Sequence, residues 1–183
     1  MSWKTLDSKV VYDTPWITVH EDQVINPGGG RNTYGHIHFK KKAIAIVPVD
    51  DDGNTWIVGQ DRYTLGKYSW EVPMGASEEG EDPLTTAHRE LREETGLSAG
   101  LMTQVMRLHT SNSITDEEGF VFIARDLSEG ETEFDEMEVL EIRKLPIGDV
   151  VAMIERGEMT DAMSVAAILR VHSDQSSNRA ETT

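Results

Sequence analysis

The hydrophobic and polar positions along the chain divide it into a β-rich first part and a later part that mixes helices with further strands. From Trp3 to Pro73, short runs rich in Val, Ile, Thr and aromatic residues are broken by turn-forming residues, a pattern typical of strands. Turns are predicted at 26–30 and 50–54. The predicted strands are Lys4–Tyr12, Trp16–Ile25, Thr33–Phe39, Ala43–Val49, Thr55–Gln60 and Ser69–Val72.

A helix is predicted from Pro83 to Thr95. Pro83 suits the first turn, the acidic residues Glu81 and Asp82 lie at its positive end, and Gly96 ends it. Further strands are predicted at Leu101–His109, Phe120–Ala124 and Val139–Arg143, and further helices at Ile147–Glu155 and Asp161–Val171. Because strands and helices do not alternate regularly, the pattern indicates an α/β sandwich or an α+β fold.

The composition narrows the class of protein. A chain of 183 residues suits one compact domain with a small appendage. The absence of Cys excludes disulfides, thiolate metal sites and a cysteine nucleophile, and fits a cytoplasmic protein. Neither a signal peptide nor a membrane span is expected, because no sufficiently long apolar run occurs. A net charge of -16 argues against binding to nucleic acid or to an anionic membrane.

Two acidic blocks carry the whole negative excess. Residues 71–98 have a net charge of -6, and residues 116–141 have a net charge of -10. Such runs are usually solvated faces or loops, but they also suit the binding of hard cations. Composition does not decide between the two interpretations, whereas the spacing within the first block does.

Glu90, Glu93 and Glu94 fall toward one edge of the predicted helix, because helical neighbours are three and four residues apart. Glu90 and Glu94 flank an apolar stripe expected to face the sheet, at Leu84, Ala87 and Leu91. Two unit charges about 4 Å apart repel by roughly 4 kcal/mol at an effective dielectric constant of about 20. Hard divalent ions such as Mg²⁺ or Mn²⁺ would offset this repulsion, and they also suit diphosphate substrates.

Residues 75–97 read GASEEGEDPLTTAHRELREETGL and resemble the Nudix box, G-x5-E-x7-R-E-U-x-E-E-x-G-U, in which U is aliphatic. The matching positions are Gly75, Glu81, Arg89, Glu90, Leu91, Glu93, Glu94, Gly96 and Leu97. The resemblance implies an α/β fold: the Nudix α/β/α sandwich of a mixed sheet with flanking helices, here preceded by an N-terminal antiparallel β segment. The expected division is a β segment at 1–40, a catalytic domain at 41–172 and a disordered tail at 173–183.

The resemblance to Nudix hydrolases also implies roles for residues of the box. Glu90 and Glu94 would be the main ligands of Mg²⁺ or Mn²⁺, with Glu93 binding directly or through water and the carbonyl of Met74 adding a further ligand. Arg89 would orient the glutamates by ion pairing, and Glu81 would be structural. The general base is expected from a glutamate late in the chain, either Glu136 or Glu138.

Outside the box, the chain resembles the branch of the family that hydrolyses ADP-ribose and nucleoside diphosphate sugars. The similarity rests on the N-terminal β segment and on residues 60–62, 70–73 and 157–169. It implies a homodimer formed through the N-terminal strands and a nucleotide-sugar substrate. The substrate-binding residues expected are Trp16, Arg62, Glu71, Ser111 and Asp116.

One departure bears on the substrate. ADP-ribose pyrophosphatases usually carry a proline after the box, whereas this chain has no proline between Pro83 and Pro146. This favours a broader nucleoside diphosphate sugar hydrolase that accepts ADP-ribose among its substrates. The alternatives are a Nudix hydrolase of a dinucleotide or a nucleoside triphosphate, and a non-catalytic nucleotide-sugar sensor. The intact glutamate cluster argues against the sensor.

Several of these residues have a second interpretation. The planar guanidinium of Arg62 suits a phosphate, but it equally suits an ion pair with a neighbouring acid. Trp16 fits either a platform for the base or core packing. His36 and His38 alternate onto one strand face, yet a metal site is not favoured there because no third ligand lies nearby in the sequence.

Overall fold

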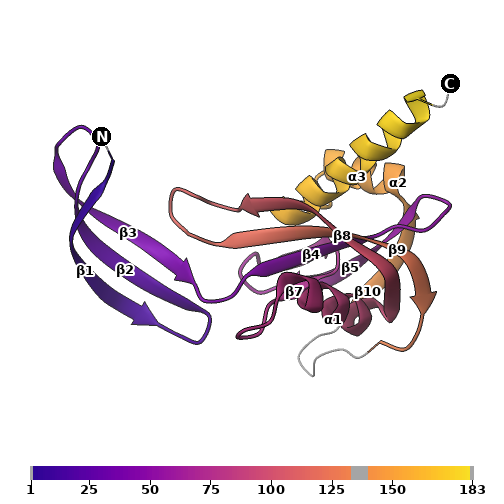
Figure 1. The fold of residues 1–183 in the computed structure, drawn as a ribbon, viewed down its shortest axis with the longest axis horizontal. Helices are drawn as coiled ribbons and strands as arrows, with labels where there is room; N and C mark the ends of the chain where they lie inside the picture. Colours follow the sequence, from indigo (N-terminus) through magenta and orange to yellow (C-terminus); the bar gives the residue numbers. More distant parts are fainter. Residues whose placement is uncertain (1, 133–139, 182–183) are drawn as a thin grey trace. The chain divides into compact units, whose positions relative to one another are not determined.

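The computed structural model describes residues 2–132 and 140–181 and divides the chain into two compact units. The first unit comprises residues 1–42 and 108–118. Its strands β1 (Lys4–Asp13), β2 (Ile17–Ile25) and β3 (Arg31–Phe39) form an antiparallel sheet in the order β1-β2-β3 (Figure 1). All ten residues of β1 are exposed.

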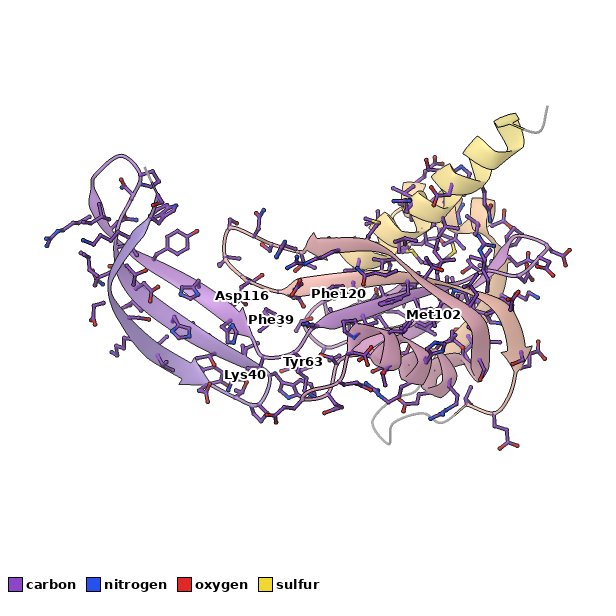
Figure 2. The ribbon with its side chains drawn as sticks, viewed as in Figure 1. Phe39, Lys40, Tyr63, Met102, Asp116 and Phe120 are labelled. Atoms are coloured by element: carbon purple, nitrogen blue, oxygen red, sulfur yellow. The ribbon has the colours of Figure 1, made fainter. Side chains whose placement is uncertain are left out.

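Residues 108–118 join this sheet at the end of β3. Ile37 and Thr115 form a parallel bridge, and the Ile37 amide donates to the carbonyl of Ile114 over 2.9 Å. Asp116 lies beside Phe39 (Figure 2), whose amide donates to Asp116 Oδ1 over 2.8 Å. Residues 108–118, which the sequence analysis assigned to the catalytic domain, are therefore anchored to the N-terminal sheet.

The second unit, residues 43–107 and 119–183, contains two further sheets. In the four-stranded sheet, β4 (Ala43–Pro48) pairs with β7 (Met74–Ala76) and, in parallel, with β9 (Glu118–Glu129), which in turn neighbours β8 (Leu97–His109). In the three-stranded sheet, β5 (Asn54–Arg62) pairs antiparallel with both β10 (Glu141–Pro146) and β6 (Lys67–Glu71). The second unit thus carries the mixed sheet that the sequence predicted.

In the described part of the second unit, helices lie on both sides of the sheets. The helix α1 (Pro83–Thr95) packs against β4 and β7 on one side, whereas α2 (Ile147–Glu155) and α3 (Ala162–Glu181) lie on the other (Figure 1). The core between α1 and the sheet consists of Ile44, Ile46, Trp56, Ala87, Leu91, Leu97, Phe120, Phe122 and Ala124. The α/β/α arrangement expected from the sequence is confirmed. Within the described ranges, no helix combines the length and the apolar character that a membrane crossing requires.

The local signals that predicted α1 act in the structure as expected. Asp82 Oδ1 caps the helix by accepting from the amides of Leu84 (3.0 Å) and Thr85 (3.1 Å). Pro83 occupies the first turn, where its missing N–H costs nothing. Gly96 ends the helix with φ of 72°, a left-handed conformation that glycine adopts without strain. These signals fix where the metal-ligand candidates lie on the helix.

Three expectations need correction. Leu84, predicted to face the sheet, is 45% exposed, because in the first turn the inward position belongs to Thr86, which bonds Glu81 and the Asp82 carbonyl. The short strand β7 was not predicted. The helix α3 continues past Val171 to Glu181, whereas a disordered tail was expected from residue 173. An ion pair between Arg170 and Asp174, one turn apart, supports the longer helix.

Candidate active site

The site is built where α1 passes β7. Glu94 is 2% exposed, and its Oε2 accepts from the amide of Met74 over 2.9 Å. Glu90 is also buried, whereas Glu93, one turn along, remains partly exposed. A buried carboxylate is costly unless it is paired, hydrogen-bonded or bound to a metal. The fold therefore brings together three of the predicted ligands and the backbone of the fourth, Met74.

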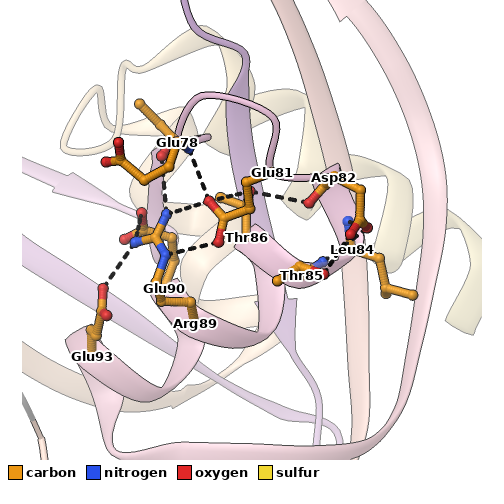
Figure 3. A network of polar contacts seen from close by, with 10 residues as sticks. Glu78, Glu81, Asp82, Leu84, Thr85, Thr86, Arg89, Glu90 and Glu93 are labelled. Carbon is orange, nitrogen blue, oxygen red and sulfur yellow. Dashed lines mark hydrogen bonds and ion pairs between the residues drawn. The ribbon is translucent and has the colours of Figure 1, made fainter.

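Arg89 is the cation that organises the cluster (Figure 3). Its Nη1 lies 2.7 Å from Glu90 Oε1 and 3.0 Å from Glu93 Oε2. Its Nη2 donates to the Ala76 carbonyl over 3.1 Å, which ties α1 to β7. The pKa of Arg89 is raised above its ordinary value, chiefly by hydrogen bonds to Glu81 and further by Glu90 and Glu93. One permanent cation thus holds two of the three clustered carboxylates in place.

Glu81 binds the guanidinium group of Arg89 through two of its nitrogens. It accepts from Arg89 Nε (3.1 Å) and Nη2 (3.0 Å), from Thr86 Oγ1 (2.9 Å) and from the Glu78 amide (2.9 Å). These bonds, led by the one from Arg89, lower the pKa of Glu81 to about 2 although burial raises it. With its oxygens engaged in this way, Glu81 anchors Arg89 and the loop before α1.

Gly75 explains why the box requires a glycine at this position. A Cβ atom built on Gly75 would overlap the carboxyl group of Glu90, closer than real contacts allow. The bare backbone of β7 therefore leaves the space in which the Glu90 carboxylate lies. The sequence showed that Gly75 matched the motif but gave no reason for it, because the reason is a contact between a strand and a helix.

Arg62 and Glu71, both predicted to bind substrate, pair with each other. Arg62 Nε lies 3.0 Å and 3.1 Å from the two carboxylate oxygens of Glu71, and Nη2 forms a further short contact. Glu71 is 3% exposed. The pKa of Arg62 is raised, first by its hydrogen bonds to Glu71 and more weakly by the charge of Glu94.

We expect Arg62→Ala to lower the free energy of unfolding by about 3 kcal/mol, because it leaves a buried carboxylate without its cation. Urea denaturation of the purified variant measures the loss. Arg170→Ala is the matched control, since it removes an arginine from an exposed pair and should cost less than about 1 kcal/mol. Equal losses in the two variants would contradict the assignment of Arg62 as the buried partner of Glu71.

The remaining predicted residues lie in the first unit or outside the described residues. Trp16 is 60% exposed, and Lys41 Nζ lies 4.7 Å from the centre of its ring. Its exposure excludes packing within the core of this chain. The backbone carbonyl of Ser111 accepts from the amides of Ile114 (3.1 Å) and Thr115 (2.9 Å) and so shapes the 111–115 turn. The two candidate general bases, Glu136 and Glu138, fall outside the described residues.

Asp116 has partners of its own within the first unit. Its Oδ2 lies 2.6 Å from His38 Nδ1, and its Oδ1 accepts from the Phe39 amide. Burial raises the pKa of Asp116, but the bonds from His38 and Phe39 outweigh this effect and keep the pKa below its ordinary value. In the structure, therefore, Asp116 acts as the anchor of the 108–118 segment.

Comparison with known families agrees with this fold. The model of the NUDIX domain matches residues 39–167, and the model of the nucleoside diphosphate sugar hydrolase N-terminal domain matches residues 3–37. The chain belongs to the Nudix family and is a Nudix hydrolase.

Individual relatives extend over nearly the whole chain. The ADP-ribose pyrophosphatase of Mycobacterium tuberculosis is 35% identical over 93% of this chain and 83% of its own length. The ADP-ribose pyrophosphatase of Bacillus subtilis is 34% identical over 90% of each chain. A crystal structure of an ADP compounds hydrolase shares the fold with a TM-score of 0.87 at 23% identity, covering 97% of this chain and 96% of its own.

Proposed function

We propose that the protein hydrolyses the diphosphate bond of nucleoside diphosphate sugars, ADP-ribose among them, to a nucleoside monophosphate and a sugar phosphate. The observation that carries the proposal is the glutamate cluster: Glu90 and Glu94 lie against β7, at Gly75 and Met74, and Glu93 shares Arg89 with Glu90. The matched N-terminal domain and the relatives named ADP-ribose pyrophosphatase support this substrate class. The missing proline after the box favours the broader specificity.

The donor set of the cluster fits a hard divalent ion. Glu90, Glu93 and Glu94 offer carboxylate oxygens and Met74 offers a backbone carbonyl, the ligand types that Mg²⁺ and Mn²⁺ prefer over nitrogen or sulfur. When bound, Mg²⁺ would neutralise the diphosphate and lower the pKa of a water molecule. Arg89, which contacts Glu90 and Glu93, would keep both oriented toward that ion.

The remaining step is removal of a proton from the attacking water, which we assign to Glu136 or Glu138. The water oxygen then bonds to one phosphorus, and the bond from that phosphorus to the bridging oxygen breaks. A general base must reach the water directly or through one intervening water. Replacing each glutamate singly by Gln separates the two, since only one loss should remove the low-pH limb of the pH–rate profile, where the rate rises as the general base loses its proton.

We further propose that the chain forms a cytoplasmic homodimer through β1. The strand exposes Leu6, Val10, Val11 and Tyr12 along its length, an unusual amount of apolar surface for a solvent-facing strand. Light scattering on the intact protein checks this, with a mass of twice 20.5 kDa expected.

A substrate screen tests the proposed function as a whole. ADP-ribose, GDP-mannose, UDP-glucose, a dinucleoside polyphosphate and a deoxynucleoside triphosphate are each incubated with and without Mg²⁺, and the products are identified by mass. We expect Mg²⁺-dependent release of nucleoside monophosphate and sugar phosphate from the first three. Cleavage confined to the dinucleotide or the triphosphate would replace the proposed substrate class, and binding without turnover would indicate a sensor.

Trp16→Ala should weaken substrate binding more than it lowers thermal stability, because an exposed ring has little packing to lose and a base to stack on. The KM of the variant, divided by that of the unmodified protein, measures the effect on binding. The melting temperature measures the effect on stability. Trp3→Ala is the control: Trp3 is also exposed but packs edge-on against Tyr34, with ring centroids 5.2 Å apart. A similar rise of KM in both variants would speak against Trp16 as the platform.

A further inference from the structure

A second group of potential metal ligands lies in the first unit, on one face of the N-terminal sheet. One ligand atom each from His20, Asp22 and His36 falls within 4.8 Å of the others. The group draws two residues from β2 and one from β3, so no sequence interval reveals it. The sequence had paired His36 with His38, whereas the structure groups His36 with His20 and Asp22 of β2.

Strand register explains why these side chains meet. His20 lies directly opposite His36, and Asp22, two residues along β2, points to the same face of the sheet as His20. The imidazole rings of His20 and His36 stack with centroids 4.9 Å apart and an interplanar angle of 5°. His36 Nε2 lies 3.1 Å from Asp22 Oδ2.

The carboxylate of Asp22 is only partly used by the protein. Its side chain is 13% exposed, and Oδ2 is the atom that contacts His36. Within the described residues, the other oxygen, Oδ1, is buried and makes no direct hydrogen bond, although the Ser8 side chain opposite it on β1 lowers the pKa of Asp22. A buried carboxylate oxygen without a partner carries a desolvation cost that a bound cation would offset.

We propose that His20, Asp22 and His36 bind a divalent transition-metal ion of intermediate hard–soft character, such as Zn²⁺. Two imidazole nitrogens and one carboxylate oxygen are a donor set that Zn²⁺ accepts, whereas Mg²⁺ prefers oxygen ligands alone. Ligand atoms around a tetrahedral Zn²⁺ lie about 3.3 Å apart, given bonds of about 2.0 to 2.1 Å. Asp22 and His36 already meet this separation, and the His20 ring, now stacked on His36, would have to rotate to reach it.

The ion would join β2 to β3 in a unit that has little core. Among the described residues of the first unit, only Thr18 and Val24 are buried, so apolar packing within this sheet contributes little. A metal cross-link between neighbouring strands stabilises such a small sheet, since ions that bind only the folded state raise its melting temperature. The site is separate in residues and in chemistry from the glutamate cluster on α1.

Zn²⁺ binding to the full-length protein tests the proposal, with excess Mg²⁺ present to occupy all-oxygen sites. Calorimetry should show one saturable Zn²⁺ per chain, bound at least about tenfold more weakly by Asp22→Asn and His36→Gln. His38→Gln is the matched control, because His38 lies on the same strand but contacts Asp116. Glu94→Gln should also bind Zn²⁺ as the unmodified protein does.

A second measurement uses the unmodified protein, so its result does not depend on whether a substitution unfolds the sheet. Long-range ¹H–¹⁵N spectra of the imidazole groups should show the nitrogens of His20 and His36 shifting on addition of one equivalent of Zn²⁺, with those of His38 unchanged. Absence of saturable binding, equal affinity in all four variants, or shifts confined to other histidines would overturn the proposal.

Discussion

Glu94→Gln should lower turnover by about 10³-fold while leaving the fold intact, because it removes one negative ligand from a site whose chemistry depends on charge stabilisation. The fold survives because the Gln side-chain oxygen still accepts the Met74 amide, the bond that holds residue 94 at 2.9 Å from β7. Steady-state kinetics with ADP-ribose and Mg²⁺ measure the activity, and thermal denaturation checks the fold.

The matched control for this substitution is Glu79→Gln, which changes the same group on an exposed residue of the loop before α1. Its activity should stay close to that of the unmodified protein. If Glu94→Gln retained near-normal turnover, or if both variants lost activity equally, Glu94 would have no specific part in catalysis.

Gly75→Ala should reduce activity by on the order of 10²-fold with only a small change in melting temperature, because displaced catalytic groups lose rate steeply. The added methyl group would occupy the space of the Glu90 carboxyl, the end of a flexible side chain that can move aside. The strand and helix can therefore remain in place while a predicted metal ligand is displaced. Activity titrated against Mg²⁺ should show a raised metal requirement.

Gly148→Ala provides the comparison for Gly75→Ala. A Cβ atom at Gly148 meets nothing within 4 Å, and the residue is the second of α2, in its first turn. We expect unchanged activity and a slight gain in stability, since alanine favours helix over glycine by about 1 kcal/mol. Unchanged activity in Gly75→Ala as well would show that the position of Glu90 beside β7 is not required.

The sequence predicted those features of the site that depend on local signals. The bounds of α1, Pro83–Thr95, are confirmed because Asp82 and Gly96 act on the helix from within a few residues. The spacing of Glu90, Glu93 and Glu94 placed them on one edge through helix geometry alone. The Nudix box then gave the family and the enzyme class, both confirmed by the matching domain model.

Features that depend on which segments meet in space were not predictable. The pairing of Arg62 with Glu71 joins neighbouring strands, and the space that Gly75 leaves for Glu90 joins a strand to a helix. The group of His20, Asp22 and His36 depends on the register of β2 against β3. Hydrophobic periodicity predicts a strand and its faces, but it does not state which residue of another strand lies opposite.

The most direct test of the central claim is a crystal structure of the protein with Mn²⁺ and the non-hydrolysable analogue α,β-methylene ADP-ribose, with the metal located by its anomalous scattering. We predict at least one ion at about 2.1 Å from carboxylate oxygens of Glu90 and Glu94, the distance expected for hard divalent ions, and bridged to the diphosphate analogue. An analogue bound in the crystal with no ion at these two glutamates would contradict the account.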